Sequence, residues 1–348
     1  MGRFGNQLDQ LLGSIHFAIR LNRTLVLPPF LEYPYGFVKV EPKPFENIFK
    51  IEPFQDVLPV ISMEEFMDDI APDIWPNSKR YVFCHRPRTS PIAPNSPAGC
   101  HSKEGNPFGV FWDHFGVDFV EDKYFGDIGL ALDDRNVEKW IKFSEKYPVL
   151  AFTSPPAGFP SPSQYHQYQK YLEWNDDILA EAENFIKLHL SRPFVAVHLR
   201  NNVDWEQACT HVNPNHHFFA SAQCTGEDFE VTVPSKEICF PNRNTVIASI
   251  KEVVDDVGAK SIFVFSDKDH MISELYKEFG RKVAVRKLAQ PDPYVSLAIA
   301  GLSDHFIANC MSTFSAITVR QRRYQCESPK STSFFGLNLT KPIKNLEL

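Results

Sequence analysis

Short apolar runs alternate with helical patterns through the second half of the chain, and this alternation constrains the fold more than any other feature. We expect strands at the apolar runs, which are residues 193–199, 261–265, 282–285 and 305–308. We expect helices where apolar residues recur at helical spacing, which are residues 245–257, 271–279, 294–302 and 316–323. Strands that alternate with helices build a parallel sheet covered on both faces, so this half is predicted to be a Rossmann-like, doubly wound α/β domain.

The front of the chain shows the later part of a similar unit. Residues 2–6 form a glycine-punctuated loop, Gly-Arg-Phe-Gly-Asn. Helical periodicity follows over residues 8–19, and residues 24–27 are an expected strand that ends at Pro28. Loop, helix and strand are the second half of a βαβ unit. We therefore expect a strand ahead of residue 2, and a sequence that is truncated at its front.

The middle of the chain is less regular. Residues 28–110 are rich in proline, with one short helix expected at 63–70. A further strand is expected at residues 148–152 and a helix at residues 176–189. The segment between Cys84 and Cys100 is interpreted as a loop that its own two cysteines could staple.

Length and charge limit the classes of protein that this chain can represent. A chain of 348 residues suits two domains of ordinary size, and we place the boundary near residue 190, between domains at 1–190 and 191–348. The formal net charge is −7 and no basic tract is present, so we expect no nucleic-acid partner. No apolar stretch approaches the ~18–20 residues of a membrane span, so none is expected.

The cysteines and sequons are compatible with either the secretory pathway or the cytosol. The chain has seven cysteines and none forms a Cys-x-x-Cys pair, which disfavours zinc. Their irregular spacing suits disulfides in an oxidising compartment, although a reduced cytosolic enzyme can carry as many thiols. Sequons at Asn22 and Asn338 favour the secretory pathway. No signal peptide opens this sequence, so the protein is either cytosolic or longer at its natural N-terminus, and we favour the second.

The first candidate binding group is an arginine at the end of an apolar run. Phe194-Val-Ala-Val197 leads into His198-Leu-Arg200, at the carboxyl end of an expected strand, where open α/β sheets bind ligands. A guanidinium donates two parallel hydrogen bonds to a phosphate, so Arg200 suits an anion, and an ordinary surface arginine is the alternative. His198 lies on the same side of the strand and is either a second donor or a core histidine. Asp204 and Trp205 could orient Arg200 or contact an acceptor.

Two loops could bind a phosphate at a helix N-terminus. One is residues 2–6, whose glycines allow close approach of the backbone and whose Arg3 and Asn6 supply donors. The other is residues 309–314, whose serine and threonine stand between an expected strand and helix, with a simple N-cap as the alternative. These loops and Arg200 come from two Rossmann-like halves and suggest a nucleotide-sugar site in the cleft between them.

A possible metal motif follows another expected strand. Asp267-Lys-Asp269 has the Asp-x-Asp form found in many glycosyltransferases. Polar residues are also normal in the loop after a strand, and no further carboxylates cluster beside these two in the sequence. We therefore favour a structural role for both aspartates.

Several motifs together resemble the protein O-fucosyltransferases that modify EGF-like repeats. The matching segments follow the order of that family over about residues 2–336 and are residues 2–7, 103–109, 197–200, 204–205, 266–267, 309–314 and 333–336. The resemblance implies a GT-B-like α/β fold with two Rossmann-like domains facing a nucleotide-sugar cleft, the first on the acceptor side and the second on the GDP-fucose side. It implies an inverting glycosyltransferase that moves fucose from GDP-fucose to a Ser or Thr hydroxyl of a folded EGF-like repeat, with no metal or other cofactor.

The resemblance also implies the residues of the site. Arg200 corresponds to the family's essential arginine and Asn6 to the asparagine near the diphosphate and acceptor, so these are the expected catalytic residues. The expected contacts to GDP-fucose are Arg3, Phe4, Gly5, Asn6, His198, Leu199, Arg200, Ser296, Thr313 and Phe314. The general base is not evident: Asn6 is not a strong base, and Asp204 is a candidate by proximity in the sequence.

The remaining implications of the resemblance concern processing and partners. The disulfides that it implies are Cys84–Cys100, Cys209–Cys239 and Cys224–Cys310, which leaves Cys326 unpaired. Asn22 coincides with a glycosylation site of relatives. We expect a monomer in the lumen of the endoplasmic reticulum, acting on EGF-repeat proteins such as Notch-type receptors.

Three other functions remain open on the sequence. One is a fucosyltransferase for another acceptor, either a glycan or a different repeat such as the thrombospondin type, since these enzymes share a His-x-Arg arginine. Another is a non-catalytic chaperone for EGF-repeat proteins, against which the intact Arg200 and Asn6 argue. The last is a generic cytosolic nucleotide-binding protein, which free thiols would favour.

Overall fold

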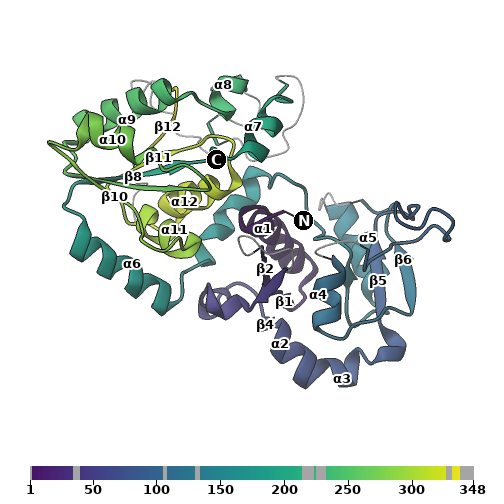
Figure 1. Ribbon diagram of the computed structural model, residues 1–348. Coiled ribbons are helices and arrows are strands. Elements are labelled where there is room, and N and C mark those ends of the chain that lie inside the picture. Colours follow the sequence, from purple (N-terminus) through teal and green to yellow (C-terminus); the bar gives the residue numbers. More distant parts are fainter. Residues whose placement is uncertain are drawn as a thin grey trace. The chain divides into compact units, whose positions relative to one another are not determined.

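The structure, a computed structural model, describes residues 2–33, 40–104, 108–129, 134–213, 223–224, 233–326 and 331–337. It contains two compact units, Met1–Glu173 and Trp174–Leu348 (Figure 1). The sequence places the boundary near residue 190. In the structure the helix α6 (Asp176–His189) packs against α11 (Pro293–Gly301), so it is part of the second unit. The sequon at Asn338 lies outside the described residues.

The second unit is built on a five-stranded sheet in which all pairings are parallel. Its strands are β8 (Phe194–Leu199), β9 (Ser261–Ser266), β10 (Ala284–Arg286), β11 (His305–Ala308) and β12 (Thr332–Phe334). They lie in the order β10-β9-β8-β11-β12, so the first strand of the unit is the central one. Every residue of β8 is buried, which explains why its sequence is an unbroken apolar run.

Helices cover both faces of this sheet, as expected for a doubly wound unit (Figure 1). The helices α9 (Arg243–Val257) and α10 (Ile272–Phe279) lie on one face, and α6 and α11 lie on the other. The remaining helices of the unit are α7 (Val203–Cys209), α8 (Lys236–Cys239) and α12 (Thr313–Tyr324). The predicted strands and helices of this half are all present, with ends that differ by a few residues, and the prediction of a Rossmann-like unit is confirmed.

Local capping explains where α9 begins and ends. The side chain of Asn242 accepts a hydrogen bond from the Thr245 N–H at 3.0 Å, which satisfies one of the free donors of the first turn. Gly258 ends the helix in the left-handed region, with φ 64°, a conformation that costs glycine little. The apolar face between these caps packs into the core through Val246, Ile250 and Val253.

A buried arginine joins the amino ends of β11 and β12. The guanidinium of Arg322 on α12 donates to the carbonyl oxygens of Ser303 at 2.7 Å and Ser331 at 2.6 Å, and also to the Ser303 hydroxyl at 3.0 Å. The side chain is 1% exposed, and this burial lowers the pKa of the guanidinium to about 10. Because the charge is spread over several carbonyl acceptors, Arg322 ties the end of α11 to both strands.

The first unit contains two smaller parallel sheets. One pairs β1 (Leu25–Leu27) with β4 (Val60–Ser62), and the other has the order β6-β5-β7, with β5 (Tyr81–Cys84), β6 (Glu121–Tyr124) and β7 (Ala151–Phe152). The strands β2 (Phe30–Glu32) and β3 (Glu41–Lys43) form a separate antiparallel pair. The region that the sequence analysis describes as irregular therefore contains several strands, each only three or four residues long.

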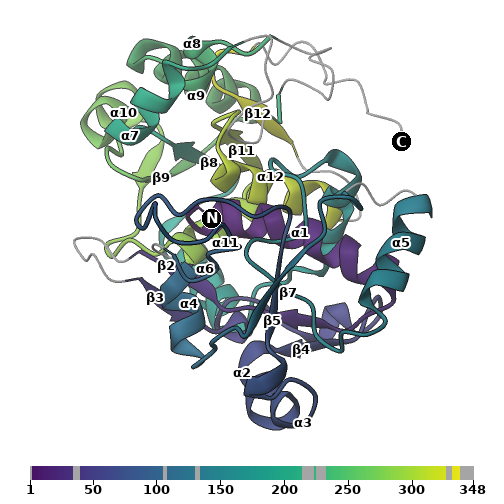
Figure 2. The same cartoon turned by 90° about the vertical axis from the view of Figure 1, so that its right-hand side faces the viewer.

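The helices of the first unit are mostly short. The longest is α1 (Phe4–Leu21), which begins inside the glycine-punctuated segment predicted as a loop, because the N–H of Asn6 already donates to the Arg3 carbonyl at 2.9 Å. Beyond β4 the chain continues through α2 (Met63–Glu65), a π-helical turn and α3 (Ala71–Ile74) at the edge of the unit (Figure 2). The other helices are α4 (Phe108–His114), α5 (Asp134–Ser144) and the 3₁₀ segments Phe45–Asn47, Glu52–Phe54, Asn77–Lys79 and Ser163–Tyr171.

Three disulfides form with the pairing that the resemblance implies. The Cα–Cα separations are 5.6 Å for Cys84–Cys100, 5.7 Å for Cys209–Cys239 and 5.4 Å for Cys224–Cys310. Cys326 is unpaired. The first disulfide staples the proline-rich loop after β5, so that interpretation is confirmed as well.

Two surface properties bear on processing. Asn22 is exposed and ends α1 in the left-handed region, with φ 50°, so its side chain is accessible to a modifying enzyme. Among the residues that the structure describes, no helix is long and apolar enough to cross a membrane.

Replacing Arg322 by leucine is expected to lower the free energy of unfolding by about 3 kcal/mol, because buried carbonyl groups that now accept from the guanidinium lose their donor. Urea unfolding measures the loss. The matched control is Arg323→Leu, an exposed neighbour on the same helix, for which we expect a change within about 0.5 kcal/mol. Equal losses in the two variants would show that the buried network contributes nothing specific.

Candidate functional site

Arg200 directly follows β8 and is held by two carboxylates. In the parallel register Leu199 pairs with Ser266, which brings Arg200 beside Asp267 at the start of the next loop. The Nη1 atom of Arg200 forms an ion pair with Oδ2 of Asp267, and its Nη2 atom lies 2.8 Å from Oδ2 of Asp204. The guanidinium also lies over the Trp205 ring, 5.0 Å from its centre. These contacts fix the orientation of the cation, as the sequence suggests for Asp204 and Trp205.

The Arg200 side chain is 15% exposed, which is low for an arginine. A cation that is already oriented and mostly withdrawn from water interacts strongly with an anion that reaches it, because less reorganisation of side chain and solvent is needed. The position, charge and orientation of Arg200 therefore suit the binding of a phosphate.

The loop after β9 is tied to the end of β8 by one asparagine. The N–H of Asn201 donates to Oδ1 of Asp267 at 2.8 Å, and its side-chain Nδ2 donates to the Asp269 carbonyl at 2.6 Å. Asp269 in turn accepts from the Met271 N–H at 2.9 Å and pairs with Arg243. Both carboxylates of the Asp-x-Asp segment thus have protein partners, which supports the structural role.

No metal site is evident in the parts of the chain that the structure covers. No group of three or more His, Cys, Asp or Glu side chains there could hold a metal ion. The independence of the reaction from metal nevertheless stays a prediction for experiment.

The N-terminus of α12 lies at the same edge of the sheet. Because β8 pairs with β11, the loop after β11 emerges next to the end of β8. The Ser315 hydroxyl in the first turn of α12 accepts from the Asn309 N–H at 3.2 Å and forms a 2.7 Å hydrogen bond with Nδ1 of His198. Ser312 is the N-cap residue, with no hydrogen bond from its side chain to the helix. A helix N-terminus and Arg200 therefore meet at the carboxyl edge of one sheet, an arrangement that favours an anion.

His198 is a core residue that stays neutral. Its ring is 2% exposed and packs against the rings of Phe265 and Phe314, with centres 4.9 and 5.1 Å away. Burial, together with the charge of Arg200, lowers the pKa of His198 to about 3. At neutral pH its role within the protein is to connect β8 with the first turn of α12, and a contact with the donor stays a prediction.

The other predicted residues of the second unit lie at different depths. Leu199 and Ser296 are buried, and the Ser296 hydroxyl donates at 2.6 Å to the carbonyl of Asp292, the N-cap residue of α11. Thr313 is the first residue of α12 and is 9% exposed, and Phe314 beside it is half-buried. Thr313 and Phe314 therefore stand at the edge that Arg200 occupies, whereas Ser296 lies inside its helix.

The predicted residues of the first unit surround the start of α1. Arg3 is exposed at the N-cap position, and Phe4 packs against the Phe30 ring with centres 4.8 Å apart. The side chain of Asn6 folds back over Gly2, where an added Cβ would lie 2.1 Å from its Nδ2 atom. A side chain at position 2 would therefore displace the Asn6 side chain from this place.

Two contributors to the site were missed by sequence reasoning. The sequence predicts a structural role for Asp267 but not its ion pair with Arg200, and it assigns no role to Ser315. The signal for Asp267 lay in the two strands themselves, because parallel strands that end together place the residues after them side by side. Ser315 offered no comparable signal, since its contact with His198 depends on how α12 packs on the sheet.

The chain has two units with parallel sheets, and the second unit carries an oriented arginine beside a helix N-terminus. These features define an α/β protein of the GT-B-like class. The sequence profile of the family described as GDP-fucose protein O-fucosyltransferase matches residues 1–325. The chain belongs to this family, and the resemblance noted from its motifs is confirmed.

Individual relatives agree with the family assignment. GDP-fucose protein O-fucosyltransferase 1 of Caenorhabditis elegans is 46% identical over 349 residues, which cover 98% of this chain and 89% of that protein. The crystal structure of POFUT1 in complex with GDP-fucose is 45% identical, covers 97% of this chain and 96% of that one, and superimposes with a TM-score of 0.92. A complex of POFUT1 with GDP gives a TM-score of 0.90 at the same identity and coverage.

The buried His198 predicts a specific loss of stability in acid. The unfolded histidine titrates near 6.5, whereas the folded pKa is about 3, so below pH 6.5 only the unfolded state takes up the proton. The free energy of unfolding should be unaffected by this group above pH 6.5 and fall as the pH approaches 3. His198→Gln should make that fall shallower in urea unfolding curves measured at several pH values.

The control for this experiment is His114→Gln, at an exposed position. It should leave the pH dependence unchanged. The free energy of unfolding of His198→Gln should still fall somewhat in acid, because burial also lowers the pKa of His305 to about 4. Identical pH profiles for His198→Gln and the unmodified chain would contradict the buried neutral state.

Proposed function

We propose that this chain transfers fucose from GDP-fucose to a Ser or Thr hydroxyl of folded EGF-like repeats, with inversion at the anomeric carbon. The observation that carries the proposal is the arrangement around Arg200, whose guanidinium is oriented at the carboxyl end of β8 beside the N-terminus of α12. It stands in a chain whose 45% identical structural relative binds GDP-fucose.

The charges of the reaction explain why this arrangement is useful. The acceptor oxygen forms a bond to the anomeric carbon of fucose while the bond from that carbon to the β-phosphate oxygen breaks, and the electron pair leaves with GDP. Negative charge therefore grows on the phosphate and positive charge on the sugar. The Arg200 guanidinium and the N–H groups at Thr313 stabilise the departing diphosphate, and a preorganised donor of this kind is typically worth ~10²–10³ in rate.

The first unit supplies the remaining proposed contacts. Arg3, Phe4, Gly5 and Asn6 stand at the N-terminus of α1, where the positive end of the helix dipole favours an anion. In this proposal Asn6 contacts the diphosphate and the acceptor hydroxyl, and it positions them without acting as a base.

The proton of the acceptor hydroxyl must also leave. Asp204 was the candidate base, but its carboxylate is committed to the Arg200 guanidinium at 2.8 Å. Because this ion pair orients Arg200, it favours a positioning role for Asp204. We propose that the proton passes to a phosphate oxygen of the leaving GDP, which gains negative charge as the bond breaks.

The covalent structure supports a proposal about the compartment. Three disulfides suit an oxidising environment, and the exposed Asn22 is open to glycosylation. We therefore propose the endoplasmic reticulum lumen as the site of action. The acceptors there are EGF-repeat proteins, with Notch-type receptors as the example.

Arg200→Ala is expected to lower the rate of fucose transfer at least ~100-fold, because the leaving diphosphate loses its oriented cation. The assay incubates the protein with GDP-fucose and a folded EGF-like repeat and weighs the product. The matched control is Arg192→Ala, which removes an arginine that pairs with Asp304 near the opposite end of β8 and should keep most of the activity. Substantial transfer by Arg200→Ala would refute the proposal.

The choice of acceptor separates this function from its alternatives. Transfer to a thrombospondin repeat but not to a folded EGF-like repeat would assign the chain to another repeat type. Folding assistance to EGF-repeat proteins by Arg200→Ala at the level of the unmodified protein, without any transfer by either, would assign a chaperone role. The anomeric configuration of the product, read by nuclear magnetic resonance, tests inversion, and unchanged activity after EDTA treatment tests the absence of a metal requirement.

Asp267→Asn is expected to lower kcat for transfer by about 10- to 100-fold, because the Arg200 guanidinium loses one of the charges that orient it. KM for GDP-fucose should change less than kcat. The control is Asp269→Asn two residues later, whose carboxylate pairs with Arg243 instead. A similar small effect of both substitutions would show that Asp267 does not position Arg200.

A further inference from the structure

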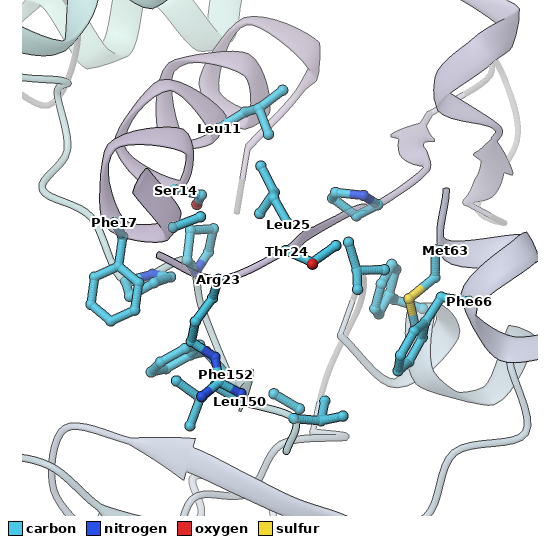
Figure 3. Close-up of a pocket in the computed structure, with 18 of the residues that line it drawn as sticks. Leu11, Ser14, Phe17, Arg23, Thr24, Leu25, Met63, Phe66, Leu150 and Phe152 are labelled. Atoms are coloured by element: carbon cyan, nitrogen blue, oxygen red, sulfur yellow. The ribbon is translucent and has the colours of Figure 1, made fainter. Parts of the chain in front are cut away.

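The large cavity of the first unit differs in character from the site around Arg200. Its volume is about 530 Å³, and side chains such as Leu11, Phe17, Met63 and Phe66 give it a mostly apolar lining (Figure 3). An apolar lining does not suit a charged diphosphate. A group that can refine the proposed reaction lies instead in the second unit, in the loop after β11.

Asn309 is the first residue after β11 and is 1% exposed. Its N–H donates to the Ser315 hydroxyl at 3.2 Å. Its Oδ1 atom accepts from the Met311 N–H at 3.2 Å, and its carbonyl oxygen accepts from the Ser312 N–H at 3.3 Å. Asn309 therefore shapes the loop that leads into α12, whose N-terminus stands at the same edge of the sheet as Arg200.

The side chain of Asn309 also reaches a backbone carbonyl of another segment. Its Nδ2 atom donates to the carbonyl of Cys239, the last residue of α8, at 3.0 Å. The same oxygen accepts from Nε1 of Trp205 at 3.1 Å. A carbonyl oxygen has two lone pairs, so both donors can bind it at once. Since the Cys239 carbonyl can only accept and the Met311 N–H can only donate, these two partners also fix which way the Asn309 amide points.

Trp205 extends these contacts to the cation of the site. Its side chain is 8% exposed, and Cζ of Arg200 lies 5.0 Å from the centre of its ring. The ring thus contacts the guanidinium with its face and the Cys239 carbonyl with its edge. A continuous series of contacts runs from Arg200 through Trp205 and Cys239 to Asn309 and the first turn of α12.

Two disulfides hold the segments that carry this series. Cys209–Cys239 joins the end of α7, the helix that carries the tryptophan, to the end of α8. Cys224–Cys310 holds the residue that follows Asn309. Because both segments are anchored covalently, the hydrogen bonds at the Cys239 carbonyl determine the spacing between them.

We propose that Asn309 is a positioning residue for fucose transfer, which sets the spacing between the Arg200 guanidinium and the N-terminus of α12 through the Cys239 carbonyl and Trp205. This inference rests on the proposed function, in which both groups donate to one diphosphate as its bond to fucose breaks. Both contacts must form at the same moment, and a misplacement of ~1 Å can cost about 100-fold in rate. Asn309 thus acts on kcat without touching GDP-fucose.

A purely structural role is the competing explanation. In that case the Asn309 side chain would serve only to satisfy buried backbone groups, and its loss would lower Tm without changing kcat. The Cys239 carbonyl, however, already accepts from Trp205, so its need for a partner is met without a second donor. The shared acceptor therefore favours the positioning role, because the second hydrogen bond fixes the place of the loop relative to the tryptophan.

The test uses two substitutions that each remove one donor to the Cys239 carbonyl. Asn309→Ser keeps a hydroxyl that can accept from the Met311 N–H but is too short to reach the carbonyl. Trp205→Phe keeps an aromatic face beside Arg200 but lacks the indole N–H. We expect each substitution to lower kcat about 10-fold and to change KM for GDP-fucose less than about threefold. The double variant should also lose only about 10-fold, because either substitution alone breaks the series of contacts.

An unchanged kcat in Asn309→Ser would overturn the proposal. So would a loss of about 100-fold in the double variant, since that is the product of two independent effects. If Asn309→Ser does not fold, Asn309→Asp, which keeps the shape and the acceptor but loses the donor, is judged by the same criteria. The matched control is Asn242→Ala, which removes an asparagine that caps α9 and should lower Tm while leaving kcat unchanged.

A spectroscopic measurement separates this proposal from the proposed function. The indole N–H signal of Trp205, identified by its absence in Trp205→Phe, is followed by nuclear magnetic resonance in protein labelled with ¹⁵N-tryptophan. We expect Asn309→Ser to shift this signal and Asn242→Ala to leave it in place, because the strength of a hydrogen bond depends on the other partners of its acceptor. An unshifted signal in Asn309→Ser, with transfer by the unmodified protein intact, refutes the positioning role alone. Absence of transfer by the unmodified protein refutes the proposed function, and the positioning role with it.

Discussion

The position of β8 at the centre of its sheet is the constraint on which the candidate site depends. The strand is buried at every residue and has parallel partners on both edges, so its direction and its end are fixed. Pairing with β9 brings Asp267 to Arg200, and pairing with β11 brings the N-terminus of α12 to the same edge. The cation and the helix dipole come together because both neighbours run parallel to one strand.

The arginines at the two ends of this sheet have different roles. At the carboxyl edge, Arg200 is held between two carboxylates and keeps an oriented charge for an incoming anion. Near the amino ends of the strands, Arg322 donates to backbone carbonyls, and Arg192 pairs with Asp304. The contacts of Arg200 orient its guanidinium for a ligand. The donors of Arg322 and Arg192 instead form hydrogen bonds and ion pairs that stabilise the fold. Binding and stability therefore depend on different arginines of one unit.

Sequence reasoning succeeded in the second unit and was weaker in the first for a physical reason. The runs that became β8, β9 and β11 are apolar throughout because helices cover both faces of the sheet, and such runs stand out from the helices between them. In the first unit β1 lies within the strand expected at residues 24–27, but β2, β3 and β4 have three residues each, too few to show a period. Proline-rich composition hid them further, since proline within β3 is typical of loops or of edge strands.

The sequence by itself determined the class of fold, the family and the candidate residues, because motifs, periodicity and caps are local properties of the chain. Tertiary structure decided which of those residues act on one another. It made His198 a buried neutral link to Ser315 and turned Asp267 into the partner of Arg200. These outcomes depend on strand register and on burial, which arise only when segments far apart in the sequence pack together.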